Sequence, residues 1–137
     1  MSRIMAIDYG RKRTGIAVTD PAKIIANGLT TVATHDLLSF IQDYVKKEDV
    51  DCIVVGKPTQ MSGEASENAM RVNAFIEQLK KTLPNMLIRE YDERFTSVLA
   101  HRAMLEGGLK KSDRRNKALV DEISATIILQ SYMESNR

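Results

Sequence analysis

Apolar residues in the first third of the chain gather in three short runs, at residues 4–7, 16–18 and 24–32. Turn-forming residues separate these runs, first between Tyr9 and Gly15 and then at Asp20-Pro21. Short apolar runs with this spacing are typical of consecutive β-hairpins. The pattern therefore predicts three antiparallel strands at the start of the fold.

The remainder of the chain alternates between helical and strand-like spacing of its apolar residues. In order, the spacing indicates a helix over residues 37–45, a strand over 52–55, a helix over 69–79, a strand over 86–91, and helices over 98–105 and 116–133. The continuous apolar run at 52–55 is typical of a central strand that is covered on both faces. We therefore expect an α/β fold with a five-stranded mixed sheet, in which two parallel strands follow the three antiparallel hairpin strands and helices flank the sheet.

Length and composition fit a single domain over residues 1–137. Of these 137 residues, 43% are hydrophobic and 28% are charged, which are the proportions of a globular protein. No apolar run approaches the roughly 20 residues of a membrane span, and the single cysteine, Cys52, fits a reducing compartment. Because the first strand starts directly after residues 1–3, we expect no signal peptide. Together, these features predict a cytoplasmic protein with no membrane partner.

Positive charge is clustered along the chain, although the formal net charge is only +2. One cluster consists of Arg11, Lys12 and Arg13. A second cluster is opposed only by Asp113 and consists of Lys110, Lys111, Arg114, Arg115 and Lys117. Local basic patches are the electrostatic footprint of a polyphosphate partner. Two solvated loops would produce the same pattern, so charge alone does not decide the function.

Acidic residues occur at three places where an ionised carboxylate would lose hydration. Asp8 directly follows the apolar run at residues 4–7. Asp92 and Glu93 stand where a predicted strand gives way to a helix. Asp121 and Glu122 both fall in apolar arcs of the last helix, so helical periodicity does not choose between them.

Two kinds of explanation account for these acids. In the first, Asp92 or Glu93 caps the following helix, and Asp121 forms a buried salt bridge with Arg94 or Arg102. In the second, the acids share a site for Mg²⁺ or Mn²⁺, because these ions prefer carboxylate and water oxygens as ligands. Two such ions about 4 Å apart can align a water molecule with a phosphodiester bond.

Four motifs occur at wide intervals along the chain. They are Ile7-Asp8-Tyr9-Gly10 followed by Gly15-Ile16-Ala17-Val18, Val55-Gly56-Lys57-Pro58 leading to Gly63 and Ser66, Asp92-Glu93-Arg94-Phe95-Thr96-Ser97, and Val120-Asp121 with Ser124-Ala125 and Ile128-Leu129. In their order and distances these motifs resemble the YqgF/RuvX family, and the resemblance covers essentially the whole chain. At Lys57 the sequence departs from the family, which usually has an apolar residue before the proline.

The resemblance implies a ribonuclease-H-like fold and a catalytic centre with three acids. Carried over by position, the catalytic and metal-holding residues are Asp8, Glu93 and Asp121, with Asp92 as a helper or a cap. The family is described as a nuclease of pre-16S rRNA and, by similarity to RuvC, as a Holliday junction resolvase. The nucleic-acid contacts expected on this basis are Arg11, Lys12, Arg94, Lys110, Lys111, Arg114 and Arg115. An ion pair between Arg94 and Glu93 is the equal alternative for that arginine.

We therefore expect a hydrolase, namely a Mg²⁺- or Mn²⁺-dependent endonuclease that cuts phosphodiester bonds in structured nucleic acid. Processing of the 5′ end of pre-16S rRNA in ribosome biogenesis is the favoured activity. The alternatives are a Holliday junction resolvase in DNA recombination and repair, and a non-catalytic RNA-binding assembly factor. We expect a monomer or a weak homodimer.

The opening hairpin, from Asp8 to Gly15, also resembles the phosphate-binding hairpin of actin-like sugar kinases. Those kinases need two such domains with a cleft between them, and 137 residues cannot supply both. We therefore expect no nucleotide cofactor.

Overall fold

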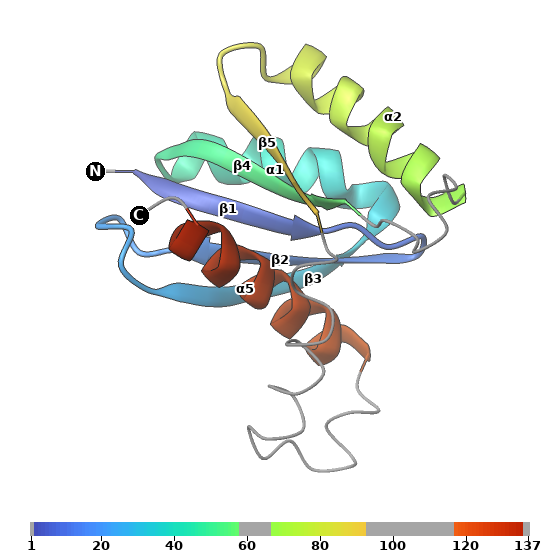
Figure 1. Cartoon of the computed structure of the whole chain (residues 1–137). Coiled ribbons are helices and arrows are strands. Elements are labelled where there is room, and N and C mark those ends of the chain that lie inside the picture. Colours follow the sequence, from blue (N-terminus) through green and yellow to red (C-terminus); the bar gives the residue numbers. More distant parts are fainter. Residues whose placement is uncertain (1, 58–66, 93–116, 136–137) are drawn as a thin grey trace.

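The computed structural model describes residues 2–57, 67–92 and 117–135 (Figure 1). Its elements are, in chain order, β1 (Arg3–Asp8), β2 (Arg13–Thr19), β3 (Ala26–Ala33), the short 3₁₀ helix η1 (Thr34–Asp36), α1 (Leu37–Lys47), β4 (Val50–Lys57), α2 (Glu67–Thr82), β5 (Leu87–Asp92) and α5 (Lys117–Ser135). The predicted elements that fall within these residues appear in the expected order. The helix predicted over residues 98–105 lies outside the described residues.

The five strands form one mixed sheet in the order β3-β2-β1-β4-β5. β1 pairs antiparallel with β2, and β2 pairs antiparallel with β3. β4 lies parallel to β1, and β5 lies parallel to β4. Parallel neighbours need a crossover connection, and α2 forms part of that connection between β4 and β5. The predicted mixed sheet of three hairpin strands and two parallel strands is confirmed.

The start of the third strand differs from the expectation. The apolar run begins at residue 24, but β3 begins at Ala26, and Ile24 and Ile25 are 66% and 58% exposed in the preceding turn. The side chain of Asp20 accepts hydrogen bonds from the backbone N–H groups of both isoleucines, at 2.7 and 2.8 Å. These bonds, above all the one from Ile25, lower the pKa of Asp20. An aspartate-capped turn therefore takes the two isoleucines out of the strand.

The sheet separates two apolar cores. On one face, Met5, Ile7 and Ile53 pack with residues of α1 and α2 such as Ile41 and Val72. On the other face, small side chains of the sheet, including Ala6 and Ala17, pack under α5. Figure 1 shows α5 on the near side of the sheet and α1 behind it. Small residues under α5 let the helix approach the strands closely, which matters for the acids at its beginning.

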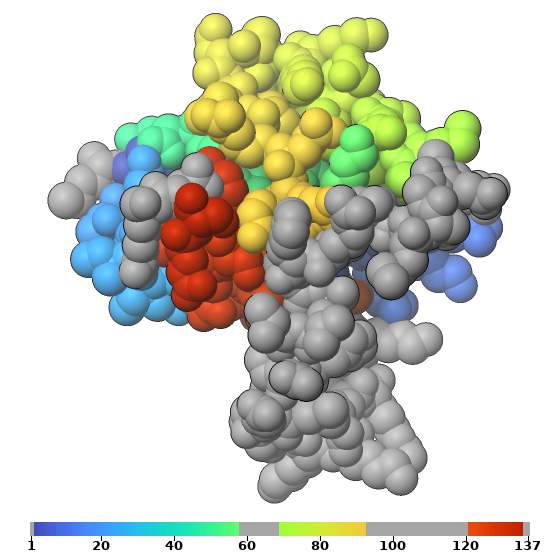
Figure 2. All heavy atoms as spheres, in the orientation of Figure 1, coloured from blue at the N-terminus to red at the C-terminus, as the bar shows by residue number. Residues whose placement is uncertain are grey.

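Helix α5 also reaches the edge strand β5. The rings of Tyr91 and Tyr132 meet edge to face with their centroids 6.4 Å apart. Figure 2 shows α5 in red next to β5 in yellow on this face of the molecule. Beneath them, burial raises the pKa of the Cys52 thiol, as expected for a small core residue.

The carboxyl ends of the parallel strands lie at one edge of the sheet. Ile7 in β1 is in register with Val55 in β4, and Val55 is in register with Glu90 in β5. Asp8, Lys57 and Asp92, the last residues of these strands, therefore reach the same edge. This is the edge at which α/β sheets place their functional sites.

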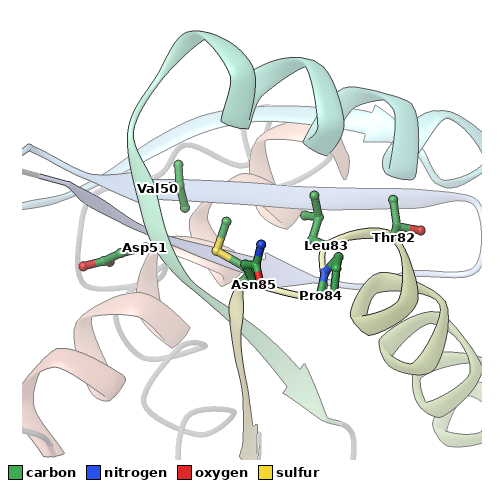
Figure 3. A pocket seen from close by; sticks show the side chains of 7 residues that line it. Val50, Asp51, Thr82, Leu83, Pro84 and Asn85 are labelled. Atoms are coloured by element: carbon green, nitrogen blue, oxygen red, sulfur yellow. The ribbon is translucent and has the colours of Figure 1, made fainter.

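A hollow of about 440 Å³ lies at the opposite edge of the sheet. Figure 3 shows its lining at the start of β4 and around the turn before β5, formed by Val50, Asp51, Thr82, Leu83, Pro84, Asn85 and Met86. It lies at the strand ends farthest from Asp8 and contributes nothing to the candidate site.

Among the helices that the structure describes, none is long and apolar enough to cross a membrane.

Candidate active site

Asp8 ends β1 on the sheet face that α5 covers. Side chains alternate between the two faces along a strand. Ile7 belongs to the core under α1 and α2, and Ala6 belongs to the core under α5. Asp8 therefore shares the face of Ala6 and lies half-buried at its edge. In the antiparallel pair with β2, the Cα partner of Asp8 is Gly15.

Gly15 is also the point at which α5 comes closest to β2. A Cβ atom added to Gly15 would lie 2.0 Å from the carbonyl oxygen of Asp121 and 3.0 Å from the backbone nitrogen of Glu122. Only glycine leaves room for the helix backbone at this position. Because antiparallel Cα partners are about 5 Å apart, Asp8 and the backbone of Asp121 are both immediate neighbours of Gly15. The structure thus places two of the three predicted catalytic acids next to the same glycine.

The carboxylate of Asp121 is paired with an arginine of the sheet. The Nε atom of Arg13, the first residue of β2, donates to Oδ2 of Asp121 at 3.3 Å. The pair is half-buried, with 41% of the Arg13 side chain and 28% of the Asp121 side chain exposed. Arg94 and Arg102, the partners expected from sequence, lie outside the described residues. Sequence reasoning placed Arg13 in a basic cluster but missed it as a site residue.

Strand alternation alone predicts which residues of β2 share a face with Arg13, and the structure shows that α5 covers this face. Arg13, Gly15 and Ala17 occupy alternate positions of β2 and therefore share one face. Ala17 belongs to the core under α5. Arg13, two positions before Gly15, therefore points to the side of the sheet on which α5 carries Asp121.

The other acids left open by the sequence lie elsewhere. Glu122 reaches over β3, since a Cβ added to Gly28 would lie 2.5 Å from its Oε1 atom. In the strand order, β2 stands between β3 and β1, so Glu122 points away from Asp8.

Asp92 shares the face of Ile88, which packs on the α1 and α2 side of the sheet. Asp92 thus lies on the sheet face opposite Asp8.

The donor set at Gly15 fits a hard divalent cation in its chemistry. Asp8 and Asp121 supply carboxylate oxygens, the ligands that Mg²⁺ and Mn²⁺ prefer. Glu93, the third predicted ligand, follows Asp92 and lies outside the described residues. Within residues 2–57, 67–92 and 117–135, no group of three or more histidine, cysteine, aspartate or glutamate side chains is gathered closely enough to hold a metal ion.

Of the predicted nucleic-acid contacts, the structure describes Arg11 and Lys12. Both are exposed in the turn between β1 and β2, directly beyond Asp8, and line a hollow of about 660 Å³. Lys57, the departure from the family pattern, lies 3.5 Å from Glu90 through its Nζ atom. The remaining predicted contacts lie outside the described residues: Arg94, Lys110, Lys111, Arg114 and Arg115.

Comparison with known proteins shows full-length relatives. The family described as "RuvX: Holliday junction resolvase" matches residues 2–135. A protein of Bacteroides fragilis described as "Putative pre-16S rRNA nuclease" is 68% identical over 137 residues, which are 100% of this chain and 99% of the relative. A protein of Bacteroides thetaiotaomicron with the same description is 66% identical over the same length, with the same coverage.

Solved structures show the same fold at much lower identity. RuvC of T. thermophilus in complex with a Holliday junction substrate superposes with a TM-score of 0.61 at 14% identity, covering 98% of each chain. A second structure of Thermus thermophilus RuvC gives a TM-score of 0.55 at 13% identity, covering 96% of each chain. The fold is therefore the RuvC-like ribonuclease H fold. The family match and the full-length relatives together show that the chain belongs to the RuvX family.

Proposed function

We propose that this protein is a metal-dependent nuclease that hydrolyses phosphodiester bonds in pre-16S rRNA, working in the cytoplasm as one domain over residues 1–137. The names of the relatives at 66–68% identity over the full length support the substrate. The observation that carries the proposal is that Asp8 and the backbone of Asp121 are both neighbours of Gly15, on the sheet face that α5 covers.

Three acids would hold the cation, namely Asp8, Asp121 and Glu93. A bound Mg²⁺ or Mn²⁺ would supply Lewis-acid polarisation of the phosphate and activation of a water molecule. The chain itself fixes where two of the acids stand. Asp8 sits at the end of a central strand that is paired on both sides, by β2 and β4, and Asp121 is placed by a helix whose backbone rests on Gly15.

Arg13 has a positioning role in this arrangement. Its guanidinium orients the Asp121 carboxylate and offsets part of its charge through the 3.3 Å contact. It also competes with a cation for the same oxygen. Arg13 therefore influences the affinity of the Asp121 carboxylate for a cation.

Cleavage of Holliday junctions is the second candidate, and the description of the family supports it. The likeness to RuvC, at 14% identity, supports the fold alone. A symmetric junction would call for a two-fold dimer, whereas a monomer suffices for the end of an RNA. We favour pre-16S rRNA because relatives at 66–68% identity carry that name.

The test offers the purified protein both substrates. Labelled RNA spanning the 5′ end of 16S rRNA and a labelled four-way DNA junction are incubated with Mg²⁺, with Mn²⁺ and with EDTA. We expect metal-dependent cutting of the RNA, loss of cutting in Asp8→Asn, and unchanged RNA binding by that variant. Asp43→Asn makes the same change at an exposed position of α1 and should cut normally.

Cutting in EDTA, or full activity of Asp8→Asn, would refute the mechanism. Cutting of the four-way junction alone would show that the substrate is a Holliday junction and not pre-16S rRNA. Binding of RNA without any cutting by the wild type would indicate a non-catalytic assembly factor instead.

A further inference from the structure

A basic hollow lies next to the carboxyl end of β1, the strand that ends at Asp8. It measures about 660 Å³ and is lined by Tyr9, Arg11, Lys12, Thr34, His35 and Arg71. Tyr9 follows Asp8 in the chain and, by strand alternation, turns to the opposite face of the sheet. Tyr9 indeed packs against the core under α1 and α2. The hollow therefore begins next to the candidate active site and opens on the other side of the sheet edge.

The hollow continues as a groove between α1 and α2. A second hollow of about 460 Å³ shares Tyr9, Thr34, His35 and Arg71 with the first and extends to Ser39 in α1 and to Gln78 in α2. Figure 1 shows the connection between β1 and β2 and the beginnings of α1 and α2 on the same side of the molecule. The two hollows share four lining residues, and Tyr9, which directly follows Asp8 in the chain, is one of them.

Positive charge dominates the lining of the hollow. Arg11, Lys12 and Arg71 bring three permanent cations, while no aspartate or glutamate occurs among the described residues that line either part. The side chain of His35 is 82% exposed, and its Nε2 atom lies 3.4 Å from Oδ2 of Asp36. A groove with this charge attracts an anion, and a repeated set of cations suits a polyanion.

The basic turn is held in place from below. The backbone N–H of Thr34 donates to the carbonyl oxygen of Lys12 at 2.9 Å, and the Thr34 hydroxyl donates to the carbonyl oxygen of Gly10 at 2.7 Å. The ring of Tyr9 packs on Phe75 of α2 with centroids 5.2 Å apart. Hydrogen bonds thus hold the turn that carries Arg11 and Lys12, and a packed ring pair lies next to it. Binding of an anion therefore requires little ordering of the backbone.

We propose that this hollow binds the phosphodiester backbone of the substrate strand as it leaves the active site. The proposal rests on the proposed nuclease function for the identity of the ligand. Arg11, Lys12 and Arg71 contact phosphates, which makes the binding independent of base sequence and sensitive to salt. The hollow adds Arg71 and His35, from elements far apart in the chain, to the substrate surface.

The test measures binding of a short labelled single-stranded RNA, without divalent metal, over a series of salt concentrations. Arg71→Glu should raise Kd at least tenfold at low salt, and Arg71→Gln should reduce the slope of log K against log salt by about 1. Lys81→Glu is the matched control, because it reverses a charge near the other end of α2 and lies outside both hollows. Its Kd should change less than twofold.

A second variant guards against misfolding of the first. His35→Glu places an acid at the exposed rim, where no packing is lost, and should raise Kd severalfold. If Arg71→Glu and His35→Glu bind as Lys81→Glu does, the hollow is not a phosphate site, even where the wild type cuts RNA through Asp8. If the variants weaken binding but the wild type never cuts, the hollow stands and the nuclease function fails.

Discussion

Replacing Gly15 by alanine tests the central claim that the close approach of α5 to β2 positions Asp121. The added Cβ would lie 2.0 Å from the carbonyl oxygen and 2.3 Å from the carbonyl carbon of Asp121. Both atoms belong to the helix backbone, so no change of side-chain rotamer relieves the clash. Side-chain carbons essentially never approach another atom within 3.0 Å, so the beginning of α5 must retreat by about 1 Å.

The magnitude follows from this displacement. Overpacking of a close contact costs about 1–3 kcal/mol, which exceeds the roughly 0.4–1 kcal/mol that alanine returns by restricting the unfolded chain. We therefore expect a net loss of about 1–2 kcal/mol in the free energy of unfolding. A catalytic group misplaced by 1 Å can lower the rate about 100-fold, so cleavage should fall far more than stability.

Gly28→Ala is the matched control on the neighbouring strand. There the added Cβ would meet Oε1 of Glu122 at 2.5 Å and Cγ at 2.8 Å, which are atoms of a flexible side chain. Rotation of Glu122 relieves this clash without moving the helix. Gly28→Ala should therefore change stability by less than about 1 kcal/mol and leave the cleavage rate within about twofold of the wild type.

Two measurements decide the matter. Urea denaturation followed by circular dichroism gives the free energy of unfolding, and single-turnover cleavage at saturating enzyme gives the rate of the chemical step. RNA binding by Gly15→Ala should be nearly unchanged, since the basic hollow lies on the other face of the sheet. Cleavage at the wild-type rate by Gly15→Ala, or an equal loss of activity in Gly28→Ala, would show that the contact at Gly15 does not position Asp121.

Two further predictions concern charged pairs. Arg13→Gln should lower the free energy of unfolding by less than about 1 kcal/mol, since the pair with Asp121 is partly exposed. It should also lower the Mn²⁺ concentration needed for half-maximal thermal stabilisation, because Arg13 no longer competes for the carboxylate. A higher Mn²⁺ requirement would contradict this competition. Burial acts to raise the pKa of Asp51, but hydrogen bonds from Lys23 and Ser2 outweigh it and hold the pKa below 3.8. A lowered pKa stabilises the fold above the unfolded value and loses that effect as the pH falls through the folded value. Asp51→Asn should therefore be less stable than the wild type at pH 7, by under about 1 kcal/mol, and the difference should shrink on acidification in urea titrations; a difference that stays constant with pH would count against it.

Local patterns were sufficient to predict the order of the elements that the structure describes. The run at residues 52–55 became the buried centre of β4, and the helical spacing of residues 69–79 became the buried stripe of α2. Such patterns reflect burial of one face at a time, which short stretches of sequence encode. Ile24 and Ile25 show the limit, because the hydrogen bonds of Asp20 override their apolar character.

The spacing of apolar residues is enough to show that Asp8 and an acid near position 121 occupy places where an ionised carboxylate is costly, because apolar neighbours flank both positions. It did not determine which acids meet. Helical periodicity placed Asp121 and Glu122 in apolar arcs alike, and the family resemblance favoured Asp121. The contacts of α5 then place the backbone of Asp121 against Gly15 of β2 and the side chain of Glu122 over Gly28 of β3. The pairing of Arg13 with Asp121 spans 108 positions of the chain. Contacts over that distance depend on how helix and sheet pack together, which no local spacing of residues encodes.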